Sequence, residues 1–162
     1  MRAEHNAYIG LGSNLDDPKA QLGQALAHLA ALPVSHQVAV SHFYVSKPVG
    51  PQDQPDFINA CVHLRTALSP LALLDQLQGI EQRQRRVRLR HWGPRTLDLD
   101  LLLYDDLVID HPRLHLPHRE LHRRGFVLIP LLDIAPDLLH SGTRCPIKAL
   151  VTDELRATLT RL

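Results

Sequence analysis

The chain has 162 residues, of which 44% are hydrophobic and 22% are charged, and its formal net charge is +1. This composition is that of a soluble globular protein, and the length predicts a single domain over residues 1–162 with a sizeable core. A net charge this small excludes a protein that binds polyanions over its whole surface, so we expect no nucleic-acid partner.

The N-terminus and the cysteines indicate in which part of the cell the protein is expected. Residues 1–6 contain no apolar segment of the signal-peptide type, and no run is long and apolar enough to span a membrane. Cys61 and Cys145 lie far apart and lack metal-ligand spacing, so we expect reduced thiols. These features predict a cytoplasmic protein with no membrane partner, which we expect to be a monomer.

A strand and a helix are the first predicted elements. Residues 7–11 form a short apolar run that ends at residues 12–14, Gly-Ser-Asn. Pro18 suits a first helical turn, and apolar residues then recur at helical spacing, which predicts a helix to about Leu32. A Gly-Ser turn before a helix can cradle a phosphate, but a structural turn is favoured here.

Two predicted strands, 38–45 and 57–66, flank a proline-rich loop over residues 46–56. Alternation in the second strand places Phe57 and Asn59 on the face opposite the core. Such a pair could stack on a planar ligand and hydrogen-bond to it, although simple packing is favoured for Phe57 from these residues alone. A helix that begins at Ser69-Pro70 follows.

The stretch from Arg83 to Tyr104 is the most informative. An arginine cluster fills its first half, and its second half alternates, so that the leucines at 97, 99, 101 and 103 share one face. Asp98 and Asp100 share the other face with Leu102 and Tyr104, with the two aspartate Cα atoms about 6.5–7 Å apart. Neighbouring carboxylates can hold a hard cation, and guanidinium groups suit polyphosphate. A solvated strand face is the simpler reading, but repulsion between the carboxylates counts against it.

The residues after Tyr104 predict secondary structure more than they predict a functional site. Residues 111–118 form a loop rich in proline and histidine, without the ligand spacing of a zinc site. An apolar run at 126–132 and a C-terminal helix follow. The predicted order β-α-β-β-α-β is the ferredoxin-like arrangement: an α+β fold with an antiparallel sheet, helices on one face and C-terminal helical additions. The other face of the sheet would then be free for a site.

Residues 91–102, HWGPRTLDLDLL, closely resemble the signature of the 6-hydroxymethyl-7,8-dihydropterin pyrophosphokinase family of folate biosynthesis. The resemblance extends to residues 12–15, to the loop 50–59 and to residues 117–126. It implies an ATP-dependent pyrophosphokinase that transfers the β,γ-pyrophosphoryl unit of ATP to the hydroxymethyl oxygen of the pterin and leaves AMP. The expected cofactor is Mg²⁺, as two ions, with ATP as co-substrate.

The resemblance also implies roles for individual residues. Catalysis is expected from Arg86, Arg95, Asp98 and Asp100, and the metal ligands would be Asp98 and Asp100. The residues expected to bind ATP are Gln78, Glu81, Arg88, His91, Trp92, Arg95, Leu101, His118, Arg119 and Arg124. The residues expected to bind the pterin are Ser46, Val49, Phe57, Asn59 and Phe126. In many relatives, arginine stands at the position of His91 and tyrosine at the position of Phe57.

Two other functions are compatible with parts of the sequence. A magnesium-dependent nucleotidyltransferase can combine a Gly-Ser turn with an Asp-x-Asp pair, but Gly93-Pro94-Arg95 and the loop 50–59 argue against it. A ferredoxin-like RNA-binding module could use the arginine cluster. However, aromatic residues make up only 4% of the chain, and the aspartates would repel a phosphate backbone.

Overall fold

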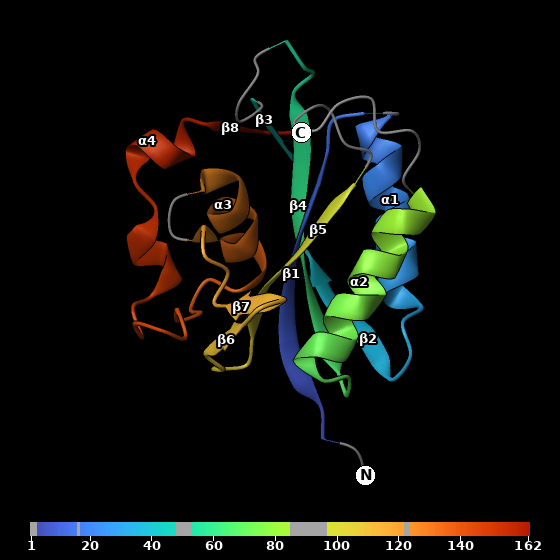
Figure 1. The fold of residues 1–162 in the computed structure, drawn as a ribbon. Coiled ribbons are helices and arrows are strands. Elements are labelled where there is room, and N and C mark those ends of the chain that lie inside the picture. The colour runs from blue at the N-terminus through green and yellow to red at the C-terminus, as the bar shows by residue number, and fades with distance from the viewer. Residues whose placement is uncertain (1–2, 16, 48–52, 85–96, 122–123) are drawn as a thin grey trace.

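The computed structural model describes residues 3–15, 17–47, 53–84, 97–121 and 124–162. A twisted sheet stands between two helical layers (Figure 1). Among the helices of these residues, none combines the length and the apolar character needed to cross a membrane.

The main sheet is six-stranded and antiparallel in all its pairings, with the order β5-β1-β4-β3-β8, and β2 also pairs with β4. A separate two-stranded sheet joins β6 and β7. The strands are β1 His5–Ser13, β2 Ser35–Val40, β3 Tyr44–Ser46, β4 Phe57–Thr66, β5 Asp98–Tyr104, β6 Ile109–His111, β7 Leu114–Leu116 and β8 Leu159–Arg161.

The helices α1, Pro18–Ala30, and α2, Pro70–Gln84, cover one face of this sheet (Figure 1). Local sequence explains where they begin, because the Asp17 side chain accepts a hydrogen bond from the Ala20 N–H and the Ser69 hydroxyl accepts one from Ala72. Apolar side chains from both helices and from β1, β4 and β5 form the larger core. Its fully buried members include Ile9, Leu22 and Leu77.

The C-terminal part of the chain covers much of the second face. Helix α3, Gly125–Ile134, packs against β4 and β1, and a smaller core forms between its Leu128 and Leu131 and the strand residue Cys61. The 3₁₀ helix η2, Ile147–Leu150, and the short helix α4, Asp153–Arg156, follow. The expected C-terminal additions are thus present, but the expectation that the whole second face is free is wrong.

A β-bulge changes the predicted faces of β5. The register with β1 shifts so that Tyr8 pairs with Leu103 and Ile9 pairs with Leu101. Leu102 and Leu103 both lie in the smaller core, and Tyr104 lies in the larger one. The prediction of strict alternation is therefore wrong for Leu103 and Tyr104, because the extra residue of a bulge reverses the pleat after it.

Other differences between the predicted and the observed elements lie in segments whose apolar residues do not recur at a regular spacing. The strand predicted over 38–45 is two strands, β2 and β3, separated at residues 41–43. The predicted loop 111–118 contains the end of β6, the turn and all of β7, and β8 pairs with β3 where only a helix was expected. Strands of three residues are too short to show a pattern.

The partial burial of His63 predicts a pH-dependent stability. His63 stacks on Tyr8 with ring centroids 4.6 Å apart, and its Nε2 lies 2.8 Å from Asn6 Oδ1. Burial, and then the nearby charge of Arg65, lower the pKa of His63 below its ordinary value. Below pH ~6.5, the ordinary pKa of histidine, the unfolded chain therefore binds more protons at His63 than the folded chain does. The contribution of the neutral His63 ring to stability is thus present above that pH and is lost on acidification.

We expect His63→Gln to unfold with a shallower dependence of melting temperature on pH between about 7 and 5 than the parent protein. Thermal denaturation at a series of pH values measures this slope. His36→Gln, at an exposed position on the neighbouring strand, controls for the loss of an imidazole. Parallel slopes for His63→Gln and the parent would contradict the assignment.

Candidate functional site

A cavity of about 140 Å³ lies at the end of the sheet where β1 ends and where β4 and β5 begin. We call it the inner cavity. Ser46 at the end of β3 and Phe126 at the start of α3 also line it. Segments far apart in the sequence therefore meet here, because antiparallel pairing places the end of β1 beside the starts of β4 and β5.

Strand register sets the floor of the inner cavity. Gly12 is paired with Asn59 on one side and with Asp98 on the other. A Cβ atom at Gly12 would lie 3.4 Å from the Asn59 Oδ1 atom and 3.7 Å from the Phe57 ring. The missing side chain thus leaves the space between the carboxylate and the amide open.

One side of the inner cavity combines a buried polar pair with aromatic rings. The Asn59 amide donates a hydrogen bond of 2.7 Å to the Ser46 hydroxyl, and both residues are buried. Phe57 and Phe126 are half-buried and line the same cavity. The Arg124 guanidinium lies 5.4 Å from the centre of the Phe126 ring, a cation–π distance. Such a lining suits a flat ligand with a polar edge.

The other side of the inner cavity is acidic. Asp98 and Asp100 both line it, which places the two carboxylates on one face as the alternation predicted. Asp100 also lines a neighbouring cavity of about 380 Å³, which we call the outer cavity. The two cavities therefore meet at one carboxylate.

His118 belongs to the outer cavity and approaches Asp100, with 3.9 Å between its Nε2 and the Asp100 Oδ1. Its backbone N–H donates to Leu102 at 2.9 Å, which fixes the residue beside β5. Its Nδ1 accepts a hydrogen bond from the Glu120 N–H at 3.2 Å. In the neutral ring the proton is therefore on Nε2, the atom that faces the carboxylate.

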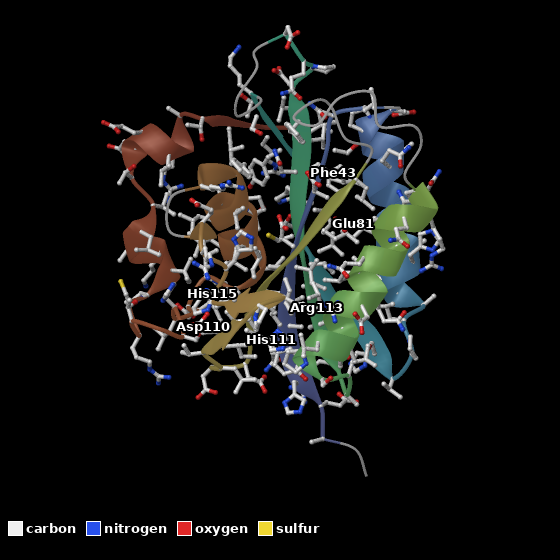
Figure 2. All side chains as sticks on the ribbon, in the orientation of Figure 1. Phe43, Glu81, Asp110, His111, Arg113 and His115 are labelled. Carbon is white, nitrogen blue, oxygen red and sulfur yellow. The ribbon has the colours of Figure 1, made fainter. Side chains whose placement is uncertain are left out.

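The outer cavity also contains residues that the sequence did not single out. His111, Arg113 and His115 line it from the β6–β7 hairpin, together with the predicted Leu101 and Arg119. Figure 2 shows Arg113 on the side of the hairpin toward α2. It donates hydrogen bonds to Asp75 and, at 3.2 Å, to Gln78. The only sequence signal was an arginine between two histidines in a proline-containing segment.

The predicted residues Gln78 and Glu81 lie on α2. Gln78 is exposed and joins the outer cavity indirectly, through its bond from Arg113. Glu81 accepts a hydrogen bond of 2.8 Å from the Leu99 N–H, between the two aspartates in sequence (Figure 2). This bond fixes the end of α2 against the start of β5. Arg119 lies 4.0 Å from Asp110, and both side chains are exposed.

Several predicted residues lie outside the described residues, so their roles stay predictions. Val49 belongs to residues 48–52, and the rest belong to residues 85–96: Arg86, Arg88, His91, Trp92 and Arg95. Within the described part of the chain, no three or more histidine, cysteine, aspartate or glutamate side chains form a group that could hold a metal ion. Any metal at the aspartate pair would need ligands from elsewhere.

Comparisons with known proteins identify the family of this chain. The family model for 7,8-dihydro-6-hydroxymethylpterin-pyrophosphokinase (HPPK) matches residues 8–136. A Haemophilus influenzae protein named 2-amino-4-hydroxy-6-hydroxymethyldihydropteridine pyrophosphokinase is 56% identical over 133 residues, which cover 82% of this chain and 83% of that protein. A Pseudomonas aeruginosa protein of the same name is 52% identical over 140 residues, which cover 86% of each chain.

Solved structures support the fold. The crystal structure of Plasmodium falciparum HPPK-DHPS wild type with pteroate matches with a TM-score of 0.76 at 15% identity. The match covers 99% of this chain and 46% of that one, so the chain spans less than half of that protein. The fold class and the family predicted from the sequence are both confirmed. This chain belongs to the 7,8-dihydro-6-hydroxymethylpterin-pyrophosphokinase family and is a pyrophosphokinase, an enzyme of the transferase class.

Proposed function

We propose that this enzyme transfers pyrophosphate from ATP to the hydroxymethyl group of 6-hydroxymethyl-7,8-dihydropterin in a magnesium-dependent reaction. The products are AMP and the pterin diphosphate, in a step of folate biosynthesis. The observation that carries the proposal is that Asp100 lines both the inner and the outer cavity. A carboxylate shared by two cavities is placed where a group would pass from one substrate to the other.

The inner cavity suits the pterin. Phe57 and Phe126 line it, and aromatic rings can stack on a flat, weakly hydrated bicycle. The buried Ser46–Asn59 pair can bond to the polar edge of the ring system. A site built from buried polar groups selects strongly against analogues that leave those groups unpaired. We therefore assign recognition of the pterin edge to this pair.

The outer cavity suits the triphosphate of ATP. Arg113, His118 and Arg119 line it, and guanidinium groups bind phosphate oxygens in a bidentate manner. His118 presents its Nε2 proton toward the junction of the cavities and can donate to a phosphate oxygen. We assign to Arg86 and Arg95 the stabilisation of charge that develops on the transferring group.

The donor set fits magnesium that arrives with ATP. Mg²⁺ is commonly bound through one or two protein carboxylates together with substrate phosphates and water. Asp98 and Asp100 supply two carboxylates on one strand face in one cavity. When bound, the metal would supply charge neutralisation at the phosphate oxygens. The protein's own part is to orient both substrates and to exclude water.

Product identity tests the proposed function. Purified protein is incubated with ATP, magnesium and 6-hydroxymethyl-7,8-dihydropterin, and the products are separated by chromatography. We expect AMP and a diphosphorylated pterin in equal amounts, and neither of them when a chelator is present. Pyrophosphate release with a nucleotidylated pterin, or no consumption of ATP that depends on the pterin, would refute the proposal.

The aspartate pair gives the first mutational prediction. We expect Asp98→Asn and Asp100→Asn each to lower kcat by at least about a hundredfold, because an amide neutralises less of the cation charge than a carboxylate does. Steady-state assays at saturating magnesium measure this. Asp106→Asn, at an exposed position after β5, is the matched control. Turnover close to that of the control in both variants would exclude the metal assignment.

The aromatic lining gives a second prediction. We expect Phe126→Ala to raise the Kd for the pterin by roughly tenfold, because a stacking face is lost, with little change in the Kd for an ATP analogue. Isothermal titration with each ligand separates the two effects. Phe43→Ala removes a half-buried ring that packs on the larger core instead. Equal weakening of pterin binding in both variants would argue against a role for Phe126 in stacking.

The floor of the inner cavity gives a third prediction. In Gly12→Ala the new methyl group meets Asn59 and Phe57 at ordinary contact distances, so the fold should tolerate it. The same methyl group enters the cavity, and we expect roughly tenfold weaker pterin binding at an unchanged melting temperature. Gly23→Ala, on α1 with nothing within 4 Å of its added Cβ, is the control. Unchanged pterin affinity in Gly12→Ala would place the ligand elsewhere.

A further inference from the structure

Helix α3 carries a residue of the inner cavity near its start and an acidic residue near its end. Phe126 and Asp133 are seven residues apart, which is about two helical turns or roughly 10 Å, so their side chains leave the helix in nearly the same direction. Whatever restrains Asp133 therefore also restrains the rotation of the helix about its axis, and with it the direction of Phe126.

Asp133 is bonded to the segment that leads into β3. Its Oδ2 atom accepts a hydrogen bond of 2.7 Å from the Tyr44 hydroxyl and one of 3.3 Å from the His42 N–H. Burial, followed by this hydrogen bond and the charge of Asp133, raises the pKa of Tyr44 to about 12. The phenol is therefore a hydrogen-bond donor throughout the physiological range.

Tyr44 is also in register with the polar pair of the inner cavity. Across the sheet it is paired with Asn59 on β4 and with Arg161 on β8. Two residues further along β3 lies Ser46, whose hydroxyl accepts the hydrogen bond of the Asn59 amide. The Tyr44 ring is buried, whereas Asp133 is exposed. Tyr44 thus joins the strands that hold the Ser46–Asn59 pair to the helix that holds Phe126.

The remaining contacts of α3 with the sheet are mainly apolar. Val127, Leu128 and Leu131 pack into the smaller core. Apolar packing is non-directional and allows a helix to shift or rotate slightly, whereas a hydrogen bond between fixed groups specifies one orientation. The bond between Tyr44 and Asp133 has the geometry needed for that purpose.

We propose that Tyr44 and Asp133 are positioning residues for pterin recognition, which hold the stacking face of Phe126 at a fixed place relative to the Ser46–Asn59 pair. Neither residue lines the inner cavity, so both act through the residues that do. This inference rests on the proposed function, because it assumes that the inner cavity holds the pterin.

The test compares two tyrosines that each lose a single hydroxyl. Tyr44→Phe removes the bond to Asp133, and Tyr104→Phe removes the bond that Tyr104 donates to the Leu68 carbonyl beside the larger core. We expect about five- to tenfold weaker binding of 6-hydroxymethyl-7,8-dihydropterin to Tyr44→Phe, with the Kd of a non-hydrolysable ATP analogue within about twofold of the parent. Tyr104→Phe should change neither value, whatever its melting temperature.

Asp133 provides a conservative rescue. Both donors use the same carboxylate oxygen, so the single side-chain oxygen of Asp133→Asn can still accept from Tyr44 and His42. Asp133→Leu keeps the branching at the γ position, is larger and has no acceptor. We expect pterin affinity close to the parent value in Asp133→Asn and a loss like that of Tyr44→Phe in Asp133→Leu. Titration calorimetry with each ligand measures all of these constants.

The outcomes separate this inference from the proposed function. If the parent binds the pterin and Tyr44→Phe binds it equally well, the positioning role is refuted and the proposed function stands. Equal weakening in Tyr44→Phe and Tyr104→Phe would also refute it, because the effect would then follow general stability. A parent protein that binds no pterin would overturn the proposed function and this inference together.

Discussion

The site depends on the register of three antiparallel strands. Asp98, Gly12 and Asn59 lie in one row across β5, β1 and β4, and they present a carboxylate, an empty position and an amide in that order. A shift of one residue in either pairing would turn these side chains to the other face. The two cores specify the register because each strand has buried apolar residues on both faces. Packing of the sheet therefore determines the chemistry at its end.

Much of this arrangement could be predicted from local pattern. Alternation in residues 57–66 and 98–102 assigned Phe57, Asn59, Asp98 and Asp100 to one face, because side-chain direction in a strand follows directly from sequence spacing. The bulge could not be predicted in this way, since it depends on how Tyr8 and Ile9 of the partner strand pair with β5. The same holds for β8, which is a strand through its pairing with β3.

The missed residues of the site have a similar explanation. Arg113 reaches the outer cavity because the β6–β7 hairpin lies beside α2, and no spacing in the sequence records that contact. Tyr44 likewise shows its relation to Asp133 only when α3 is placed on the sheet. Residues that act through contacts distant in sequence can be identified only once the fold is known, whereas residues that share one strand or helix can be predicted from their spacing in the sequence.

The hydrogen bond between Glu81 and Leu99 has a consequence for how this enzyme can vary. It joins the end of α2 to the start of β5, and the buried Gln84 amide is bonded to Gln21, which joins the last turn of α2 to α1. Leu99 lies between Asp98 and Asp100 in β5, so the position of α2 and the position of the two carboxylates are linked. A core substitution that shifts α2 on the sheet would therefore disturb the aspartate pair as well as the packing. The apolar side of α2 can vary during evolution only as far as the place of the helix on the sheet is kept.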